Sequence, residues 1–363
     1  MSDTMHDFFA RQAEPSIAEP SGGPAPDPPR KRRRRLRRIL LASALSLVLL
    51  IGAVAGSGYL VMNHLAGSIH RISGIAALTA ADQPVMPAAT RGSMTVLLTS
   101  ADNFANGSSQ PGSSEPVQLR SGLIALVHLN ANHKGGSVVS IPPTTVVSVP
   151  GRGQLELYQA MRLGGPSLLI RTVEQLTNVR IDHYSVVNFG GVSHLIDSLG
   201  GVSVVVPRSV TSYGVSFRPG VNHLTGANSL AYVRQPAASS IGRVELQQNL
   251  VRAMLDRMAQ IHMSSSLGTD VSVLTSLDQV LSVDSNFSNS ALESLVLRLR
   301  TLHGSSAVFV TAPTVDGSPT SGGLSAVHLN TQLSDKLWQA IRGDSVAAFA
   351  HQHPDTVISI APF

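Results

Sequence analysis

The chain has 363 residues, of which 43% are apolar, and a formal net charge of +5 at pH 7. It contains no cysteine, which excludes disulfides, thiolate metal sites and thiol nucleophiles. Eight positive charges lie in the single run 30–38, so the other residues together are close to neutral or slightly acidic. The basic balance therefore belongs to one short segment, and most of the chain is not a general polyanion-binding surface.

The first 62 residues predict a tail and a membrane span. Residues 1–38 are rich in proline, serine and glycine before the arginine run, which predicts a disordered basic cytoplasmic tail. Residues 39–62 carry no charged side chain and are long enough to cross the hydrocarbon core as a helix. Because basic residues beside a first span favour the cytoplasmic side, we expect a single-pass cell-membrane protein with its C-terminal domain outside the cytoplasm.

Two other interpretations of this region are open. A cleaved secretory signal has a shorter apolar core nearer the N-terminus, although Ala53-Val54-Ala55 matches the pattern of a cleavage site. The arginine run is also typical of nucleic-acid or nuclear-import segments. Its direct contact with an apolar run favours the membrane, so we expect no nucleic-acid partner.

Residues 63–92 predict a short helical stalk and a linker, residues 93–349 a globular domain, and residues 350–363 a C-terminal tail. Runs of β-branched and apolar residues predict strands at 94–100, 121–130, 135–143, 181–189, 202–207 and 307–313. Helical spacing predicts helices at 192–201, 224–234, 242–261 and 334–345, and two more within 153–179 that are separated by Gly164-Gly165-Pro166. Strands interleaved with helices predict a three-layer α/β/α sandwich around a central mixed sheet.

Three stretches carry a family resemblance. They read IDHYSVVNFGGVSHLIDSLGGVSVVVP at 181–207, PGVNHLTGANSLAYVRQ at 219–235 and GRVELQQNLVRAML at 242–255. In this order they resemble the LytR-CpsA-Psr family of membrane-anchored bacterial envelope proteins, and the resemblance covers about residues 93–344. It implies binding of a polyprenyl-pyrophosphate-linked glycolipid and transfer of its phosphoglycan to peptidoglycan with Mg²⁺.

The resemblance also implies site residues. Asp102 matches a carboxylate expected to hold the metal, and Arg120, Arg234 and Arg243 match arginines expected to be catalytic and to bind the substrate together with Gln247. The chemistry requires such cations. Guanidinium groups bind phosphate oxygens in pairs and stabilise the charge that develops when a pyrophosphate is cleaved.

Seven other positions depart from the family's charged pattern. They are Phe104, Gly122, Pro143, Thr144, Pro236, Ser240 and Leu246. Because removing one preorganised electrostatic contact commonly costs about 3 to 4 kcal/mol of transition-state stabilisation, two hypotheses remain. The chain is a phosphotransferase that ligates glycopolymer to peptidoglycan, or it is a non-catalytic member that binds the glycolipid or an active paralogue without turnover. A role in transcription and a shared zinc site of the histidines are weaker alternatives, because the domain is expected outside the cytoplasm and the histidines lack ligand spacing.

Overall fold

The computed structural model describes residues 69–79, 81, 83–101, 122–235, 240–264, 280–301, 307–315 and 326–357. The chain divides into two compact units, residues 1–58 and 59–363, and all described residues belong to the second. Among the described residues no helix has the length and apolar character of a membrane span. The expected tail and span, residues 1–62, lie outside the described residues.

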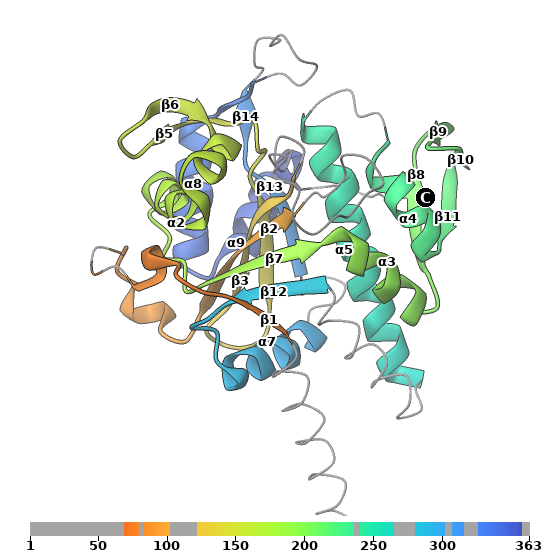
Figure 1. Ribbon diagram of the computed structural model, residues 1–363, viewed down its shortest axis with the longest axis horizontal. Coiled ribbons are helices and arrows are strands. Elements are labelled where there is room, and N and C mark those ends of the chain that lie inside the picture. Colours follow the sequence, from red (N-terminus) through yellow and green to blue (C-terminus); the bar gives the residue numbers. More distant parts are fainter. Residues whose placement is uncertain are drawn as a thin grey trace, which may run out of the picture. The chain divides into compact units, whose positions relative to one another are not determined.

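The centre of the fold is a seven-stranded mixed sheet with the order β1-β12-β7-β2-β3-β4-β13 (Figure 1). Its strands are His70–Ile72, Leu281–Asp284, His183–Asn188, Met94–Ala101, Ile124–Leu129, Gly136–Ser140 and Ala307–Thr311, in that order. Strand β1 runs parallel to β12, β2 to β7 and β4 to β13, whereas the other neighbours are antiparallel. The predicted α/β fold with a central mixed sheet is confirmed.

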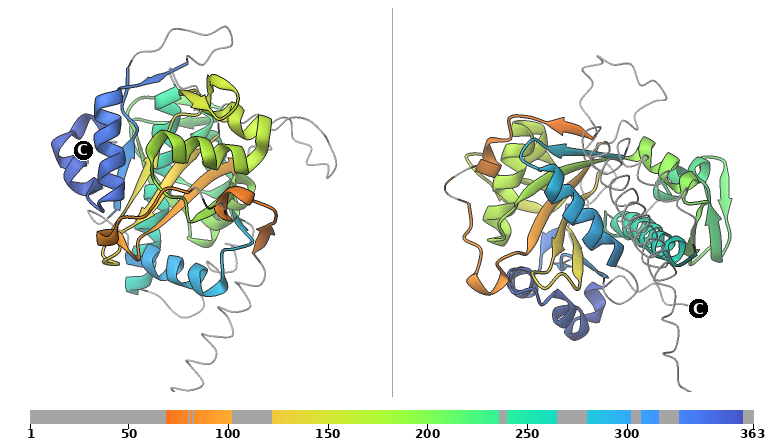
Figure 2. Two further views of the ribbon diagram at one scale, coloured as in Figure 1. Left: turned by 90° about the vertical axis from the view of Figure 1, so that its left-hand side faces the viewer. Right: turned by 90° about the horizontal axis from the view of Figure 1, so that it is seen from below.

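Helices cover both faces of this sheet (Figure 2). On one face, α2 (Leu157–Thr177), α8 (Thr331–Arg342) and α9 (Val346–Gln352) form the main core with strand residues such as Leu97 and Val139. On the other face, α7 (Asn289–Thr301) packs on Val96 and its neighbours. Since side chains alternate along a strand, Val96 and Leu97 point to opposite faces, which is how one strand contributes to both cores.

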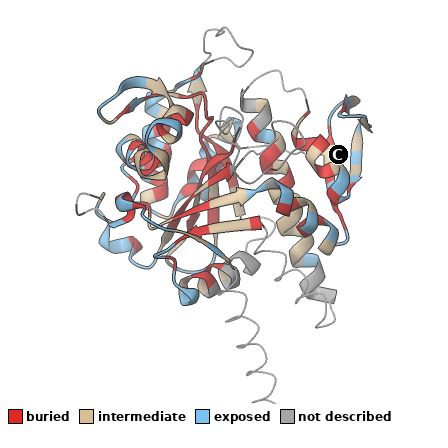
Figure 3. Ribbon diagram, viewed as in Figure 1, coloured by how far each residue is buried: buried red, intermediate tan, exposed pale blue. Residues whose placement is uncertain are grey.

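A second core lies beside the sheet. It joins α3 (Phe189–Ser198), α4 (Gly226–Val233) and α5 (Ser240–Ser264) to two small antiparallel pairs, β8 (Val202–Val206) with β11 (Gly220–Leu224) and β9 (Val210–Ser212) with β10 (Val215–Phe217). We call α3, α4 and β8–β11 the side lobe. Helix α5 contacts the main sheet at β13 and the side lobe at β8 and α4. The outer strands of the side lobe are exposed, whereas its inward face is buried (Figure 3).

Two expected boundaries need correction. The predicted stalk and linker at 63–92 is, from residue 69 onwards, part of the folded domain: β1 is an edge strand, and 3-10 helices follow at Ala76–Thr79 and Ala88–Thr90. Ala77 and Leu78 are buried in the main core, because apolar side chains gain more from that core than an isolated helix can supply. At the other end, α9 and a 3-10 helix at Pro354–Thr356 extend the described fold past residue 349.

Two further details concern local geometry. The interruption predicted at Gly164-Gly165-Pro166 is confirmed: Gly164 and Gly165 leave the helical conformation inside α2, and Gly165 has φ +62°. Three short hairpins were not predicted: β5 (Val146–Val149) with β6 (Gly153–Glu156), β9 with β10, and β14 (Thr314–Val315) with β15 (His328–Leu329). The run that precedes α2 was interpreted as part of a helix, yet it pairs as a strand.

Candidate functional site

The structure brings three of the five predicted site residues to the region where α4 meets α5. Arg234 is the residue that ends α4, Gln247 lies on α5 with a side chain that is 6% exposed, and Arg243 lies near the start of α5. Asp102 and Arg120 lie outside the described residues. Their predicted roles therefore stay predictions.

Helix α4 is held at both ends, which determines where Arg234 lies. At its start, Gly226 donates its N–H to Asp197 on α3 at 2.8 Å, and a side chain at Gly226 would collide with the backbone of α3. Near its end, the Tyr232 hydroxyl accepts a hydrogen bond from Asn249 on α5 at 3.4 Å. The Tyr232 ring is buried and meets Phe217 of β10 edge to face at 5.9 Å. The cation is therefore placed by packed aromatic and helical contacts.

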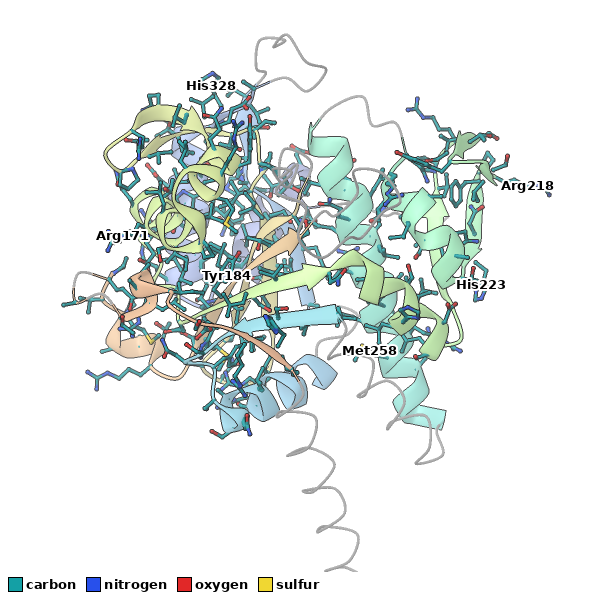
Figure 4. The ribbon with its side chains drawn as sticks, viewed as in Figure 1. Arg171, Tyr184, Arg218, His223, Met258 and His328 are labelled. Atoms are coloured by element: carbon teal, nitrogen blue, oxygen red, sulfur yellow. The ribbon has the colours of Figure 1, made fainter. Side chains whose placement is uncertain are left out.

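Arg234 lies beside an aromatic ring in a part of the chain without acidic residues. Its guanidinium carbon is 5.3 Å from the centroid of the Tyr213 ring, a cation–π contact. Residues 199–244 contain four arginines and no aspartate or glutamate. One of these arginines, Arg218, lies on the outer side of the side lobe (Figure 4). The local charge therefore favours an anionic ligand.

Helix α5 also makes polar contacts with the main sheet. Gln248, which is 2% exposed, donates its Nε2–H groups to Ser140 Oγ at 2.5 Å and to the Val310 carbonyl oxygen at 3.2 Å. One turn further, the Arg252 guanidinium carbon is 4.8 Å from the centroid of the Phe309 ring. Burial lowers the pKa of Arg252, and Asp256 opposes this effect. Sequence reasoning missed Arg252, whose signal was its four-residue spacing from Gln248 on one helix face.

Buried amide groups collect where these elements meet. Gln235 Nε2, Gln248 Oε1 and Asn249 Oδ1 are buried, and none has a hydrogen-bond partner in the described part of the chain. Buried polar atoms are nearly always paired in native proteins, so this region has the capacity to bind polar groups from outside. We call Arg234, Gln235, Gln247, Gln248 and Asn249 the α4–α5 site.

The described positions that lost the family's charges belong to the packed fold. Gly122, Pro143 and Thr144 are buried, and Leu246 packs against the second core. The carbonyl oxygen of Pro143 accepts the Tyr158 N–H at 2.9 Å, so this backbone is part of the start of α2. Of the other departures, Phe104 and Pro236 lie outside the described residues. The three buried positions are therefore part of the packed structure.

Within the described ranges, no three histidine, aspartate or glutamate side chains are placed to hold a metal ion. Glu245 on α5 is exposed, and partial desolvation raises the pKa of its carboxyl group. The expected Mg²⁺ therefore depends on Asp102, and no chemical step is assigned to the metal below.

The mixed sheet and its covering helices form the fold of a known protein family. The sequence matches the LytR_cpsA_psr family over residues 68–342, and the chain is a member of this family. The family resemblance expected from the sequence is confirmed.

Curated relatives and a solved structure agree with this membership. The chain is 30% identical over 184 residues to the polyisoprenyl-teichoic acid–peptidoglycan teichoic acid transferase TagU of Halalkalibacterium halodurans, covering 47% of this chain and 60% of the relative. It is 35% identical over 123 residues to the probable cell wall biosynthesis protein LcpB of Corynebacterium glutamicum, covering 33% of this chain and 30% of the relative. The matched region thus spans at most about 60% of these relatives.

The fold is also similar to that of the LytR-CPS2A-psr family protein YwtF (TagT), solved with bound octaprenyl pyrophosphate lipid. The TM-score is 0.51 at 22% sequence identity, and the match covers 72% of this chain and 96% of the other. At this level of identity the likeness establishes the common fold.

Proposed function

We propose that the protein is a membrane-anchored cell-envelope enzyme that binds a polyprenyl-pyrophosphate-linked glycopolymer and transfers its phosphoglycan to peptidoglycan. Family membership over residues 68–342 supports the activity, as does the name of the TagU relative. The bound octaprenyl pyrophosphate in the related structure supports the class of lipid. The uncharged run at 39–62 supports a single-pass anchor with the domain outside the cytoplasm.

The proposed reaction is a phosphoryl transfer. A hydroxyl oxygen of peptidoglycan forms a bond to the phosphorus atom that carries the glycan, and the bond from this phosphorus to the bridging oxygen of the pyrophosphate breaks. The acceptor releases its proton, and polyprenyl phosphate leaves. Arg234, with Arg243 and Arg120, would hold the pyrophosphate oxygens and stabilise the charge on the leaving phosphate. Gln247 would bind the substrate through its amide group.

One observation carries this assignment to the α4–α5 site. Arg234 is placed at the end of α4, and its guanidinium carbon lies 5.3 Å from the centroid of the Tyr213 ring. A cation held in this way is suited to an anionic substrate, because positioning it requires little reorganisation when the substrate binds. If Asp102 holds Mg²⁺, the ion would supply further positive charge to the pyrophosphate.

A second candidate function is binding without turnover, to the glycolipid or to an active paralogue. The observation that favours it is the burial of Gly122, Pro143 and Thr144 at positions where the family carries charge. Phosphoryl transfer depends mostly on positioning and electrostatic stabilisation, so losing several charges removes much of the catalytic power. Binding of the glycolipid is common to the transferase and to the first form of the second candidate.

The test uses the full-length protein in detergent micelles with a lipid-pyrophosphate glycan donor, peptidoglycan and Mg²⁺. Turnover that disappears in Arg120→Ala and Arg234→Ala supports the transferase. Donor binding without turnover supports the second candidate. If the wild-type protein does not bind the donor, the transferase and the glycolipid-binding form of the second candidate are both wrong. Arg218→Ala is the matched control, because it removes an exposed arginine of the same lobe that lies outside the proposed site.

A further inference from the structure

Tyr213 has an unfavourable backbone conformation that packing does not explain. Ser212 pairs with Val215, so Tyr213 and Gly214 form the two-residue turn between β9 and β10. Their φ angles are +47° and +77°, the pattern of a type I′ turn. Asparagine or glycine is preferred at the first of these positions, and a bulky residue there is an outlier. Because the Tyr213 side chain is 74% exposed, burial offers little compensation for this conformation.

The Tyr213 ring has a specific neighbour, the site arginine. The Arg234 guanidinium lies over the Tyr213 ring, with the guanidinium carbon 5.3 Å from the ring centroid. The turn is joined to α4 by the edge-to-face contact between Phe217 and Tyr232. The backbone of a two-residue turn has little conformational freedom. The turn geometry and the Phe217–Tyr232 contact therefore place the Tyr213 ring beside Arg234. Backbone outliers that the surrounding structure maintains cluster at functional sites, which indicates a role beyond folding.

The position of the ring matches the chemistry of a sugar phosphate. If Arg234 binds a phosphate group, the sugar esterified to that phosphate is one P–O–C linkage away. The face of a pyranose ring that carries axial C–H groups is apolar, and an exposed aromatic ring offers a complementary surface. Arginine can contact an aromatic face and still bind phosphate, because its N–H donors lie in the guanidinium plane.

We infer that Tyr213 is a positioning and specificity-determining residue: its ring holds Arg234 in place and its exposed surface receives the sugar attached to the bound phosphate. The inference rests on the proposed function, since it assigns a phosphate to Arg234. The proposed ligand is a glycosyl phosphate on a polyprenyl carrier. Its affinity for the protein should depend on the first sugar as well as on the pyrophosphate. A structural turn residue would make no such distinction.

The experiment compares two probes, octaprenyl pyrophosphate and octaprenyl pyrophosphate bearing one N-acetylglucosamine, on the full-length protein in detergent. Wild type should bind the sugar-bearing lipid more tightly. Tyr213→Asn should weaken binding of the sugar-bearing lipid by about five- to tenfold, and that of the sugar-free lipid by less. Tyr213→Phe keeps the ring and should stay within about twofold of wild type. Val221→Asn, at another exposed apolar residue of the side lobe, is the matched control and should change neither affinity.

The choice of asparagine separates binding from folding. Asparagine is favoured in this turn, so Tyr213→Asn should unfold at a temperature no lower than wild type, and weaker binding then has no folding explanation. If wild type binds both lipids and Tyr213→Asn changes both affinities equally or not at all, the sugar contact is overturned while the proposed function stands. If wild type binds neither lipid, the proposed function is wrong and this inference fails with it.

Discussion

The main core and the α4–α5 site differ in how their buried ionisable and amide side chains are paired. In the main core, His128 Nε2 and Asp344 Oδ1 lie 2.7 Å apart, His128 Nδ1 is 2.9 Å from Thr95 Oγ1, and Asp344 Oδ2 accepts the Ala131 N–H at 2.7 Å. At the α4–α5 site, by contrast, three buried amide atoms have no partner among the described residues.

The difference separates structural polar groups from binding groups. Acids and histidine within the main core are paired with one another, so their interactions serve the fold. At the α4–α5 site, the amide atoms that have no partner among the described residues lower stability, which makes them candidates for contact with a ligand. The comparison predicts that changes to paired groups, among them Asp344 and Gln248 with its bonds to the sheet, reduce stability, whereas loss of Arg234 reduces binding.

The largest effect is expected for Arg234→Ala. Loss of this cation should reduce glycan transfer by about 10²- to 10³-fold, as removal of one preorganised electrostatic contact commonly does. A transfer assay with labelled donor measures it, with Arg218→Ala as the control that stays near wild type. Equal rates for Arg234→Ala and wild type would remove Arg234 from the site.

Asp344→Asn should act on stability. We expect a loss of about 2 to 4 kcal/mol in the free energy of unfolding, because the change weakens a hydrogen-bonded pair with a buried histidine. Urea unfolding measures this loss. Asp335→Asn, an exposed residue on α8, should have little effect, and a similar loss there would show that the pairing with His128 is not the cause.

The same pair sets the acid sensitivity of the fold. Burial alone would raise the pKa of Asp344, but hydrogen bonds from His128 and the Ala131 N–H, with the charge of His128, outweigh burial and lower it. A lowered carboxyl pKa contributes stability that is present above the ordinary aspartate pKa and is lost as pH falls through the native pKa. In Asp344→Asn, the free energy of unfolding should therefore fall less between neutral and acid pH than it does in wild type. If the free energy of unfolding of Asp344→Asn depends on acid pH as that of wild type does, Asp344 is not a source of the acid sensitivity.

Gln248→Ala tests the polar link between α5 and the sheet. The change leaves the Ser140 hydroxyl without its amide donor and removes buried packing, so we expect a loss of about 1 to 3 kcal/mol in the free energy of unfolding. Urea unfolding again measures it. Gln260→Ala, at an exposed position on the same helix, is the control. Equal effects of the two changes would mean that the link to Ser140 does not stabilise α5.

The smallest effect, and the only gain, is expected for Tyr213→Asn. Asparagine adopts the left-handed conformation more readily than tyrosine, so the free energy of unfolding should rise by about 1 kcal/mol. Thermal unfolding measures the change. A fall in the midpoint of thermal unfolding would show that the Tyr213 ring stabilises the fold, as the paired groups of the main core do.

Periodicity was enough to predict five of the seven strands of the sheet and most helices, whereas β1 and β12 were not predicted as strands. Strands β2, β3 and β4 are rich in β-branched and apolar residues, and the sequence Gly-Gly-Pro indicated the break in α2. The β5–β6 hairpin and the burial of residues 69–79 were missed for a common reason. Short segments gain their structure from tertiary partners, which local patterns do not report.

The site was predictable only where the family's motif survives. Arg234 and Gln247 were found from the motif, and the structure places them on the adjoining helices α4 and α5. Arg252 and Tyr213 were missed, because nothing in the sequence shows that Arg252 meets Phe309 or that Tyr213 meets Arg234. Such contacts join residues that are far apart in the chain and depend on the packed side lobe and sheet.

The most direct test of the account measures the affinity of the full-length protein for octaprenyl pyrophosphate at neutral pH. Wild type, Arg234→Ala and Asp344→Asn are compared under conditions where all three are folded. We predict that Arg234→Ala binds at least about tenfold more weakly, since a charge-assisted contact is lost, whereas Asp344→Asn stays within about twofold of wild type. Equal affinities for wild type and Arg234→Ala would contradict the central claim that the α4–α5 site binds the pyrophosphate.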